Sequence, residues 1–440
     1  MSAMADLRPF RMLRPTDLTA PRVAAPPYDV VDVAEARALA GRNPDSFLHV
    51  SRPEIDLWDG TPADSPRAHE AGRAALAALV DRGVLVADDR PVYAVLRIRS
   101  DIGRGEQTGI VAAASVADYV SGAIATHEQT RPDKEDDRVH HIEGIGAHDE
   151  PVFLLAAPGE QAWNPVGEVI RRVVARRAAD LSATDGWSNV AAVADMSNTP
   201  ATDEHVPTHP EHELWVVDEP ADIETLRSAF AAIGTVYVAD GHHRSAAAAR
   251  VAAAHRDTEG TDVFPVVVFP GEELTILPYN RVVADLGGRA PEEFLDSLGT
   301  AYEISPVPPG GDPRPTAAGQ IALRLPGGWY RLVCRERTFG DDPVAALDVS
   351  VLQTTVLEPL LGITDVRRDP RIGFVGGIRG AAELDRLVDG GTWAAAFLMH
   401  PTSVEDLVAV AGSGRDMPPK STWFEPKLAS GLFVHPFGDS

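Results

Sequence analysis

The chain has 440 residues, of which 44% are hydrophobic and 24% charged, a balance typical of a globular protein with about two or three domains. Its formal net charge of −25 argues against a nucleic-acid-binding surface, which needs clustered cations. The single cysteine, Cys334, excludes an intrachain disulfide and a cysteine zinc cluster, and we expect a small buried side chain there rather than a catalytic thiol. Without a secretory pattern or an apolar run of about eighteen residues, the chain is expected to be cytoplasmic, with no membrane partner.

The first half of the chain predicts helices and strands in alternation after a proline-rich, extended segment over 1–31. A polar stretch at 198–212 predicts a surface loop. The helices are expected over 32–41, 66–82, 165–180 and 221–232, and the strands at Phe47–Ser51, 92–99, 108–115 and Val152–Leu155.

The second half continues the alternation, with a strand and an alanine-rich helix within 235–254, a buried strand at 263–269 and a hairpin at 320–334 that turns on Pro-Gly-Gly. Helices then follow at 348–360, 381–389 and 403–411, and strands at 372–376 and 393–399. The pattern predicts an α/β fold of the mixed α+β kind, with mixed sheets covered by helices. We expect three regions: 1–160, 161–340 and 341–440.

The most informative stretch follows the strand near residue 238 and reads Asp240-Gly241-His242-His243-Arg244. Asp240 is a natural N-cap, and Gly241 lets the backbone approach a bound group closely. A helix start with an arginine and an imidazole beside it suits a phosphate. The alternative is a capped helix with solvent-facing imidazoles, because Asp-Gly is also common turn chemistry.

A second polar stretch spans residues 124–143 and begins with His127-Glu128 after an apolar segment. Partial burial there could raise the pKa of Glu128 toward a value useful for a base. Lys134 and Arg138 are four residues apart, so they would share a helix face and could clamp phosphate oxygens. A solvated, salt-bridged helix start is the alternative interpretation.

The third stretch, 417–427, combines two aromatic residues and two lysines with three prolines. It predicts an ordered loop in which Lys420 closes over a site, or a tail packed by its aromatic residues. Lysine occurs in the whole chain only at Lys134, Lys420 and Lys427, each within a polar motif. Since an ammonium and a guanidinium are not interchangeable at anion sites, these three positions are a hint of function.

Two further patterns suggest ligands less strongly. The glycine-rich segment 373–380 lacks the spacing of a dinucleotide fingerprint, so a structural turn is favoured. Neighbouring histidines on a helix point about 100° apart, so a shared metal ion is unsupported, although a metal-dependent hydrolase stays open. The histidines concerned are His127, His140, His141, His148, His242 and His243.

Over nearly its whole length the chain resembles the bacterial domain of unknown function 1015 family. The motifs that carry the resemblance are Arg8-Pro9-Phe10, 25–31 (Ala-Pro-Pro-Tyr-Asp-Val-Val), 47–54 (Phe-Leu-His-Val-Ser-Arg-Pro-Glu), His127-Glu128, 131–138 (Arg-Pro-Asp-Lys-Glu-Asp-Asp-Arg), 239–244 (Ala-Asp-Gly-His-His-Arg) and 418–422 (Pro-Pro-Lys-Ser-Thr).

More distantly, His127-Glu128 followed by the Asp240–Arg244 motif is similar to the two core motifs of ParB/sulfiredoxin-like free serine kinases. The resemblance implies a nucleotide-binding core, ATP or ADP with Mg²⁺, and transfer of phosphate to a small hydroxyl metabolite such as free L-serine. Glu128 would then act on the hydroxyl beside His127, and Asp240 would cap the helix or help to hold Mg²⁺.

The same resemblance leaves open a nucleotide-binding regulatory protein without metabolite kinase activity. In either case the expected partners are a nucleotide and a small molecule. The candidate nucleotide or phosphate ligands are Asp240, Gly241, His242, His243, Arg244, Lys134 and Arg138, and the candidate substrate or lid residues are Tyr28, Asp29, His49, Arg52 and Lys420. The kinase hypothesis requires the stretches around Glu128 and Arg244 to meet at one cleft.

Overall fold

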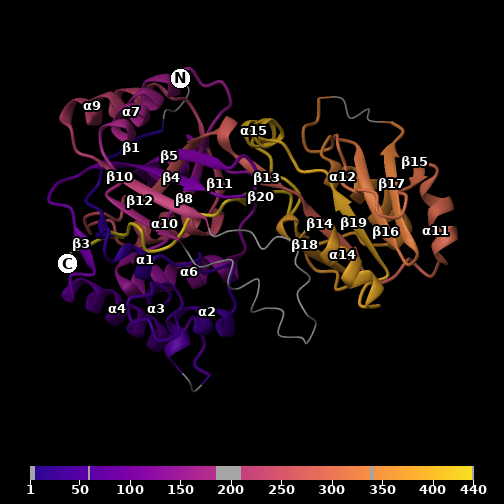
Figure 1. Ribbon diagram of the computed structural model, residues 1–440, viewed down its shortest axis with the longest axis horizontal. Helices are drawn as coiled ribbons and strands as arrows, with labels where there is room; N and C mark the ends of the chain where they lie inside the picture. Colours follow the sequence, from indigo (N-terminus) through magenta and orange to yellow (C-terminus); the bar gives the residue numbers. More distant parts are fainter. Residues whose placement is uncertain (1–4, 58–59, 185–209, 337–340, 439–440) are drawn as a thin grey trace. The chain divides into compact units, whose positions relative to one another are not determined.

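The computed structural model describes residues 5–57, 60–184, 210–336 and 341–438. The chain folds into two compact units, and each is described here by itself (Figure 1). The first unit holds the residues up to 126, 130–275 and 426 onward, and the second holds 127–129 and 276–425. Neither of the predicted region boundaries, after residue 160 and after residue 340, coincides with a unit boundary. Most of the predicted loop at 198–212 lies outside the described residues.

The core of the first unit is a mixed sheet in which nine of the described strands take part. Its order is β6-β11-β8-β12-β5-β4-β10-β9, and β1 pairs with the C-terminal end of β5. The β11–β6 and β12–β8 pairs are parallel and the others antiparallel. The strands are β1 (Leu7–Arg8), β4 (Tyr93–Arg99), β5 (Glu106–Ser115), β6 (Ile124–Ala125), β8 (Val152–Ala156), β9 (Leu181–Thr184), β10 (Glu211–Val217), β11 (Val236–Asp240) and β12 (Val263–Pro270).

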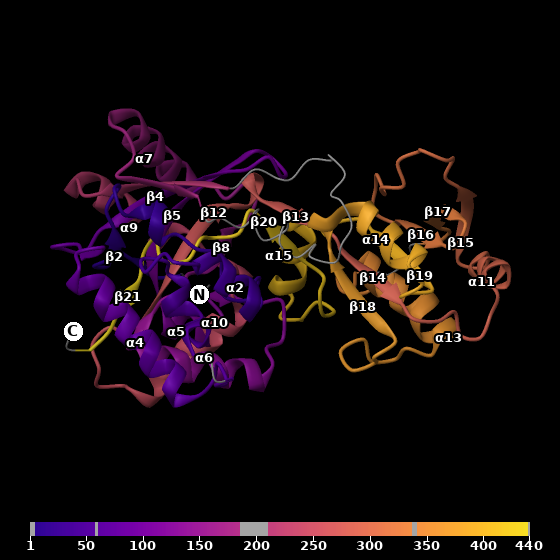
Figure 2. The same ribbon diagram turned by 60° about the horizontal axis from the view of Figure 1, so that its bottom comes forward.

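Helices cover both faces of this sheet (Figures 1 and 2). On one face lie α7 (Trp163–Arg176) and α9 (Pro220–Ala232), whose apolar side chains join the core of the sheet. On the other lie α5 (Val116–Ser121), α6 (Pro132–Ile145) and α10 (His242–Ala254). The run of alanines in α10 is buried, because small side chains let this helix pack closely between α6 and the sheet.

The N-terminal segment adds a helical layer with its own apolar cluster. Its elements are β2 (Leu13–Pro15), α1 (Ala20–Val23), α2 (Val33–Ala40), α3 (Leu48–Ser51), the 3₁₀ helix η1 (Pro53–Asp56), α4 (Pro66–Asp81) and β3 (Leu85–Ala87), with β7 (Ala147–His148) paired to β21 (His435–Pro436) beside them. The predicted strand at Phe47–Ser51 is wrong. The segment forms the helical turn α3 instead, in which the backbone N–H groups of Ser51 and Arg52 donate to the backbone oxygens of Phe47 and Leu48. A short apolar run of this kind reads equally as a buried strand or a buried helical turn, because periodicity alone does not separate the two.

The second unit is built on an antiparallel sheet of the order β15-β17-β16-β19-β14-β18. Helix α14 packs its apolar side chains on this sheet. The elements are β13 (Thr275–Leu277), β14 (Tyr279–Val283), α11 (Pro291–Leu298), β15 (Tyr302–Pro306), β16 (Gln320–Leu325), β17 (Gly328–Cys334), α12 (Asp348–Leu352), the π-helical turn η3 (Gln353–Leu357), α13 (Glu358–Leu361), β18 (Ile372–Gly376), the short 3₁₀ turn η4 (Gly377–Arg379), α14 (Gly380–Asp389), β19 (Ala395–Met399), α15 (Val404–Gly412) and β20 (Trp423–Glu425). The 3₁₀ turn η2 (Gly271–Glu273) precedes β13 and belongs to the first unit.

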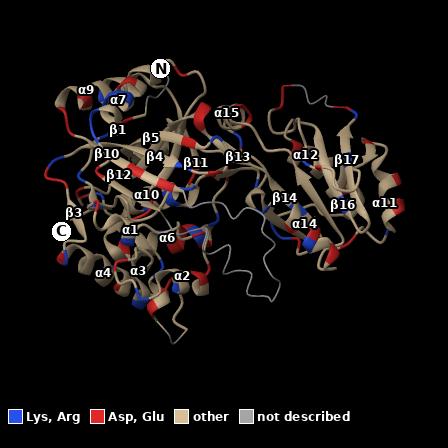
Figure 3. Cartoon of the chain, viewed as in Figure 1, with Lys and Arg blue, Asp and Glu red and all other residues tan. Residues whose placement is uncertain are grey.

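The predicted α/β class, with mixed sheets covered by helices, is confirmed. The hairpin at 320–334 and the strand at 372–376 are also confirmed, while the single helix predicted over 348–360 is interrupted by η3. Cys334 is half-buried at the end of β17. Acidic side chains are spread over helices of both units, as on α9 and α11 (Figure 3). None of the described helices is long and apolar enough to cross a membrane.

Candidate active site

The Asp240–Arg244 motif forms a strand–turn–helix junction in the first unit. Strand β11 ends at Asp240, Gly241 adopts a left-handed backbone with φ 102°, and α10 begins at His242. The left-handed backbone favours glycine, and a Cβ atom at Gly241 would crowd Arg244, whose Nε it would approach to 3.1 Å. The predicted position of the motif, between a strand and a helix start, is therefore found in the structure.

The carboxylate of Asp240 does not cap the helix, which corrects the predicted N-cap. Gly241 holds the N-cap position, and Asp240 accepts hydrogen bonds from Lys427 Nζ at 2.9 Å and Arg244 Nη2 at 2.5 Å. Burial alone would raise the pKa of Asp240, but Lys427 and Arg244 hold it well below its usual range. The cap was predicted from Asp-Gly turn chemistry, and the distant lysine takes precedence over that local preference.

The other members of the motif differ in exposure. Arg244 is 6% exposed, and its guanidinium also donates to the backbone oxygen of Pro151. His242 is buried, whereas His243 is half-buried and its Nε2 accepts the backbone N–H of Arg131 at 3.1 Å. Arg244 therefore links the turn to the residue just before β8, and His243 links it to the start of α6.

A buried polar network continues from this turn, and its other members come from distant segments. Arg138 lies on α6 with its guanidinium 3.9 Å from the centre of the Tyr28 ring, and it donates to Asp137. Its Nη1 is buried without a hydrogen-bond partner among the described residues. Glu150 accepts from Ser430 Oγ, 2.7 and 2.8 Å from its two oxygens.

Electrostatics divide the carboxylates of this network into two kinds. Burial, with the charge of Asp149 added, raises the pKa of Glu150 to about 8. Burial would also raise the pKa of Asp149, but His141, 2.9 Å away, and Arg138 hold it below its usual range. A cavity of about 10 Å³ lies among these groups, room for one water molecule. The structure thus contains a neutral and an ionised carboxyl side by side.

The His127-Glu128 motif belongs to the second unit, where it packs on the C-terminal loop. His127 is 1% exposed, its Nε2 lies 3.3 Å from Thr422 Oγ1, and its backbone oxygen accepts the N–H of Met417 at 2.7 Å. Gln129 donates to Asp416 at 2.9 Å. Glu128 is half-buried between these anchors. The second and third predicted motifs are therefore in contact, which the sequence did not indicate.

The remaining candidates for phosphate binding and for a lid lie on different elements. Lys134 is exposed on α6, whereas Arg138 on the same helix is buried, so the two do not act as one clamp. Lys420 is exposed, with Nζ 3.4 Å from Tyr279 Oη. Asp29 is exposed beside the half-buried Tyr28.

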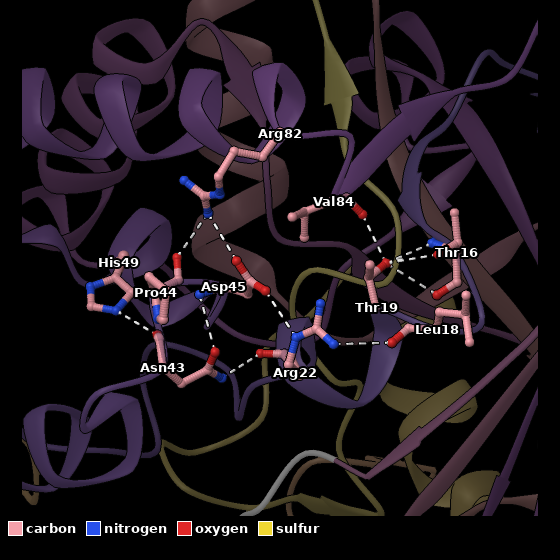
Figure 4. A network of polar contacts seen from close by, with 10 residues as sticks. All are labelled: Thr16, Leu18, Thr19, Arg22, Asn43, Pro44, Asp45, His49, Arg82 and Val84. Atoms are coloured by element: carbon pink, nitrogen blue, oxygen red, sulfur yellow. Dashed lines mark hydrogen bonds and ion pairs between the residues drawn. The ribbon is translucent and has the colours of Figure 1, made fainter.

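His49 and Arg52 make contacts within the N-terminal helical layer. His49 hydrogen-bonds the Asn43 backbone oxygen at 3.0 Å, as Figure 4 shows, and its other ring nitrogen lies 2.8 Å from Asp56. In the same view, Asp45 accepts from arginines on α1 and beyond α4. Arg52 donates to the Tyr28 backbone oxygen at 2.7 Å and so holds the loop that carries Tyr28 and Asp29.

No metal site of His, Cys, Asp or Glu side chains is found within the described ranges. The residues near the turn also fit Mg²⁺ poorly. Mg²⁺ is held by one or two carboxylates whose oxygens face it, but both oxygens of Asp240 are already paired with cations. Asp240 is therefore better described as the acceptor that fixes Lys427 and Arg244 than as a ligand of Mg²⁺.

Comparison with known proteins identifies the family. The model of the family described as "Protein of unknown function (DUF1015)" matches residues 7–350. The chain belongs to this family. The match covers the Asp240–Arg244 motif, His127-Glu128 and the N-terminal segment, as the sequence resemblance predicted. No curated protein matches the chain.

Several solved structures are similar at low identity. A free serine kinase mutant in complex with AMP is 12% identical, covers 72% of this chain and 87% of its own, and has a TM-score of 0.34. SbnI with a C-terminal truncation, from Staphylococcus aureus, is 11% identical, covers 74% and 87%, and has a TM-score of 0.37. A conserved hypothetical protein from Pyrococcus furiosus is 12% identical, covers 74% and 95%, and has a TM-score of 0.34.

Proposed function

We propose that this DUF1015 protein is a phosphotransferase that moves a phosphoryl group from ATP or ADP to a small hydroxyl metabolite, with free L-serine as the first candidate. The observation that carries the proposal is the junction at Gly241, where a strand ends, the backbone turns through a left-handed residue and a helix of thirteen residues begins. Such a helix start offers backbone N–H groups and a positive dipole to a phosphate. A nucleotide-binding core of the ParB/sulfiredoxin type is part of this proposal.

The cations around the turn support a role in phosphate binding. Lys427 and Arg244 contact Asp240 from two sides, so the turn carries one carboxylate against two cations. Arg244 is a positioning residue in this proposal, because its guanidinium is bonded to the turn and to Pro151. His243, on the half-buried side of the helix start, is the side chain proposed to face the phosphates.

Glu128 is the proposed base for the acceptor hydroxyl. Its half-buried carboxylate would take the hydroxyl proton as the oxygen attacks the terminal phosphorus, and the bond from that phosphorus to the leaving nucleotide would break. His127 is proposed to position Glu128, since its ring and backbone are both bonded to the 417–422 loop. The proposal requires the residues at Glu128 and at the turn to act in one reaction.

Phosphorus NMR tests the reaction directly. The protein is incubated with ATP or ADP, Mg²⁺ and each of a panel of hydroxyl metabolites that includes L-serine, and a phosphomonoester signal is expected with one of them. Nucleotide binding without any phosphomonoester would favour a nucleotide-binding regulatory protein and would contradict the phosphotransferase.

Two substitutions test the residues. Glu128→Gln should abolish turnover and leave nucleotide affinity within a few-fold, whereas Glu405→Gln, an exposed glutamate on α15, should change neither. Arg244→Ala should weaken nucleotide binding by about 1.5–3 kcal/mol, because the phosphate-binding turn loses the charged hydrogen bonds from Arg244 that hold it in place. An unchanged dissociation constant would place the phosphate site elsewhere.

A further inference from the structure

The second unit contains a cavity of about 330 Å³ that the proposed phosphate site does not use. Its size is within the range of small-molecule sites. Apolar side chains, among them two prolines, form much of its wall, and charged and amide groups meet within it. The polar lining residues are Arg281, Gln353, Thr364, Asp365, Arg367 and Arg368.

Arg281 is a buried cation in this cavity, 4% exposed, on β14. Its guanidinium donates to the backbone oxygens of Tyr279 and, at 3.0 Å, Lys420. Among the residues that the structure describes, no carboxylate forms an ion pair with it. Burial lowers the pKa of Arg281 to about 10, which leaves it charged at neutral pH. A buried charge without a counterion is unfavourable, and an anionic ligand would remove that cost.

The rest of the lining reinforces the preference for an anion. Arg367 and Arg368 add two positive charges, and Asp365 is the one acidic residue of the lining, so the charges give a net +2 in a chain of net −25. Gln353 donates to the Ile363 backbone oxygen at 2.8 Å, and its Oε1 is buried without a described partner. Gln353 therefore carries an acceptor oxygen that no described residue uses.

Two backbone features shape this lining. Lys420 has φ 60°, the left-handed region that non-glycine residues rarely adopt, and its backbone oxygen is the one that accepts from Arg281. Gln353 begins the π-helical turn η3, and such turns are frequent at functional sites. One deviation thus occurs at a residue that lines the cavity, Gln353, and the other at the residue that accepts from the lining Arg281.

Hydrogen bonds connect the cavity wall and the residue next to it with the segment that carries Glu128. On one side of Glu128, Gln129 Oε1 accepts from Arg367 Nη1 at 3.1 Å. On the other side, the backbone oxygen of His127 accepts from Met417, which is followed at once by two cavity-lining prolines. The proposed base and the cationic cavity are therefore parts of one structure within the second unit.

We propose that this cavity binds the carboxylate of the acceptor, a small hydroxy acid or hydroxy amino acid, with Arg281 as its counterion. The inference rests on the proposed function for the role of Glu128, but the binding itself does not require turnover. Arg281 would hold the carboxylate, Gln353 would accept from the ligand's hydroxyl or ammonium group, and the apolar wall would select a short carbon chain.

The test is calorimetric titration of the full chain, without nucleotide, with L-serine, L-homoserine, D-glycerate and L-lactate. L-Serinamide, which lacks the carboxylate, and inorganic phosphate serve as contrasting probes. Binding of at least one hydroxy acid and a much weaker response to serinamide are expected. Binding of none of the four at millimolar concentration, equal binding of serinamide, or a preference for phosphate would each overturn the proposal.

Variants locate the binding in this cavity. Arg281→Gln should weaken the affinity for the bound acid about 10- to 100-fold, the effect of losing a charged hydrogen-bond donor. Gln353→Glu should weaken it comparably, because the new carboxylate competes for Arg281, and circular dichroism checks that this variant is folded. Arg386→Gln, on the exposed face of α14, should bind as the parent does.

An unchanged affinity in Gln353→Glu and in folded Arg281→Gln would overturn the cavity assignment. Failure of the kinase proposal gives a different result. Acid binding that depends on Arg281, together with no phosphomonoester in the NMR assay, would support the carboxylate site in the cavity and contradict only the phosphotransferase proposal.

Discussion

Glu150 should make the stability of the first unit fall as the pH rises, the reverse of the usual behaviour of a carboxylate. It is buried, 6% exposed, and its pKa is raised from 4.5 to about 8, first by burial and then by Asp149. The folded chain therefore binds a proton between these two pH values that the unfolded chain releases. Glu150→Gln replaces the neutral carboxyl with a neutral amide of the same shape and removes this proton.

The magnitude follows from proton linkage. Below pH 4.5 the carboxyl is neutral in both states, and the stability associated with the neutral form is fully present. Between pH 4.5 and about 8 the unfolded chain binds fewer protons than the folded one, so the free energy of unfolding falls by about 1.4 kcal/mol per pH unit through this group. From pH 5 to pH 7 the difference between parent and Glu150→Gln should change by roughly 2–3 kcal/mol.

Urea unfolding at half-unit intervals between pH 5 and pH 7.5 measures this difference. Titrating groups far from Glu150 affect both chains alike and cancel in the comparison. Glu70→Gln, an exposed position on α4, should run parallel to the parent. Parallel curves for the parent and Glu150→Gln would refute the reasoning, since they would mean that Glu150 is ionised in the folded chain.

Two further stability predictions concern the turn. Gly241→Ala should lower the melting temperature more than Gly122→Ala does. Both glycines have positive φ, but of these two positions only Gly241 would bring the new Cβ within 4 Å of a neighbouring atom. Equal losses would contradict the close packing at Gly241. Lys427→Met should destabilise the chain by about 1–3 kcal/mol, because it leaves one oxygen of the half-buried Asp240 unpaired, whereas Lys134→Met, at an exposed position, should change stability by less than about 0.5 kcal/mol. Similar values for the two lysines would show that the Asp240 contact contributes little.

The sequence predicted the larger elements well because their burial follows their own periodicity. Strand β18 and the hairpin of β16 and β17 have the predicted positions, since apolar alternation and a Pro-Gly-Gly turn are local signals. Short elements depend on distant partners instead. Strand β6 has two residues and pairs with β11. The apolar 47–51 segment is too short for periodicity to separate a buried strand from a helical turn, and it forms α3.

The candidate site was likewise predictable only where its residues are consecutive in the sequence. Asp240–Arg244 was recognisable because its strand, glycine and helix are consecutive. Its partners are not: Lys427 is 187 residues from Asp240, and Ser430 is 280 residues from Glu150. No local pattern specifies such pairs. Tertiary contacts also decided the role of Asp240, since a lysine brought from far along the chain replaced the helix cap.

The scarcity of lysine was the one sequence feature that singled out Lys427, a partner of Asp240 from a distant part of the chain. In a chain that uses arginine for nearly every cation, Lys427 fills a position where its ammonium meets Asp240 Oδ1 while Arg244 occupies Oδ2. A compact ammonium suits a single contact on a carboxylate whose other oxygen is taken, whereas a guanidinium favours two parallel bonds and would compete with Arg244. Lys427→Arg should therefore fail to restore the stability lost in Lys427→Met, and full restoration would show that only the charge matters.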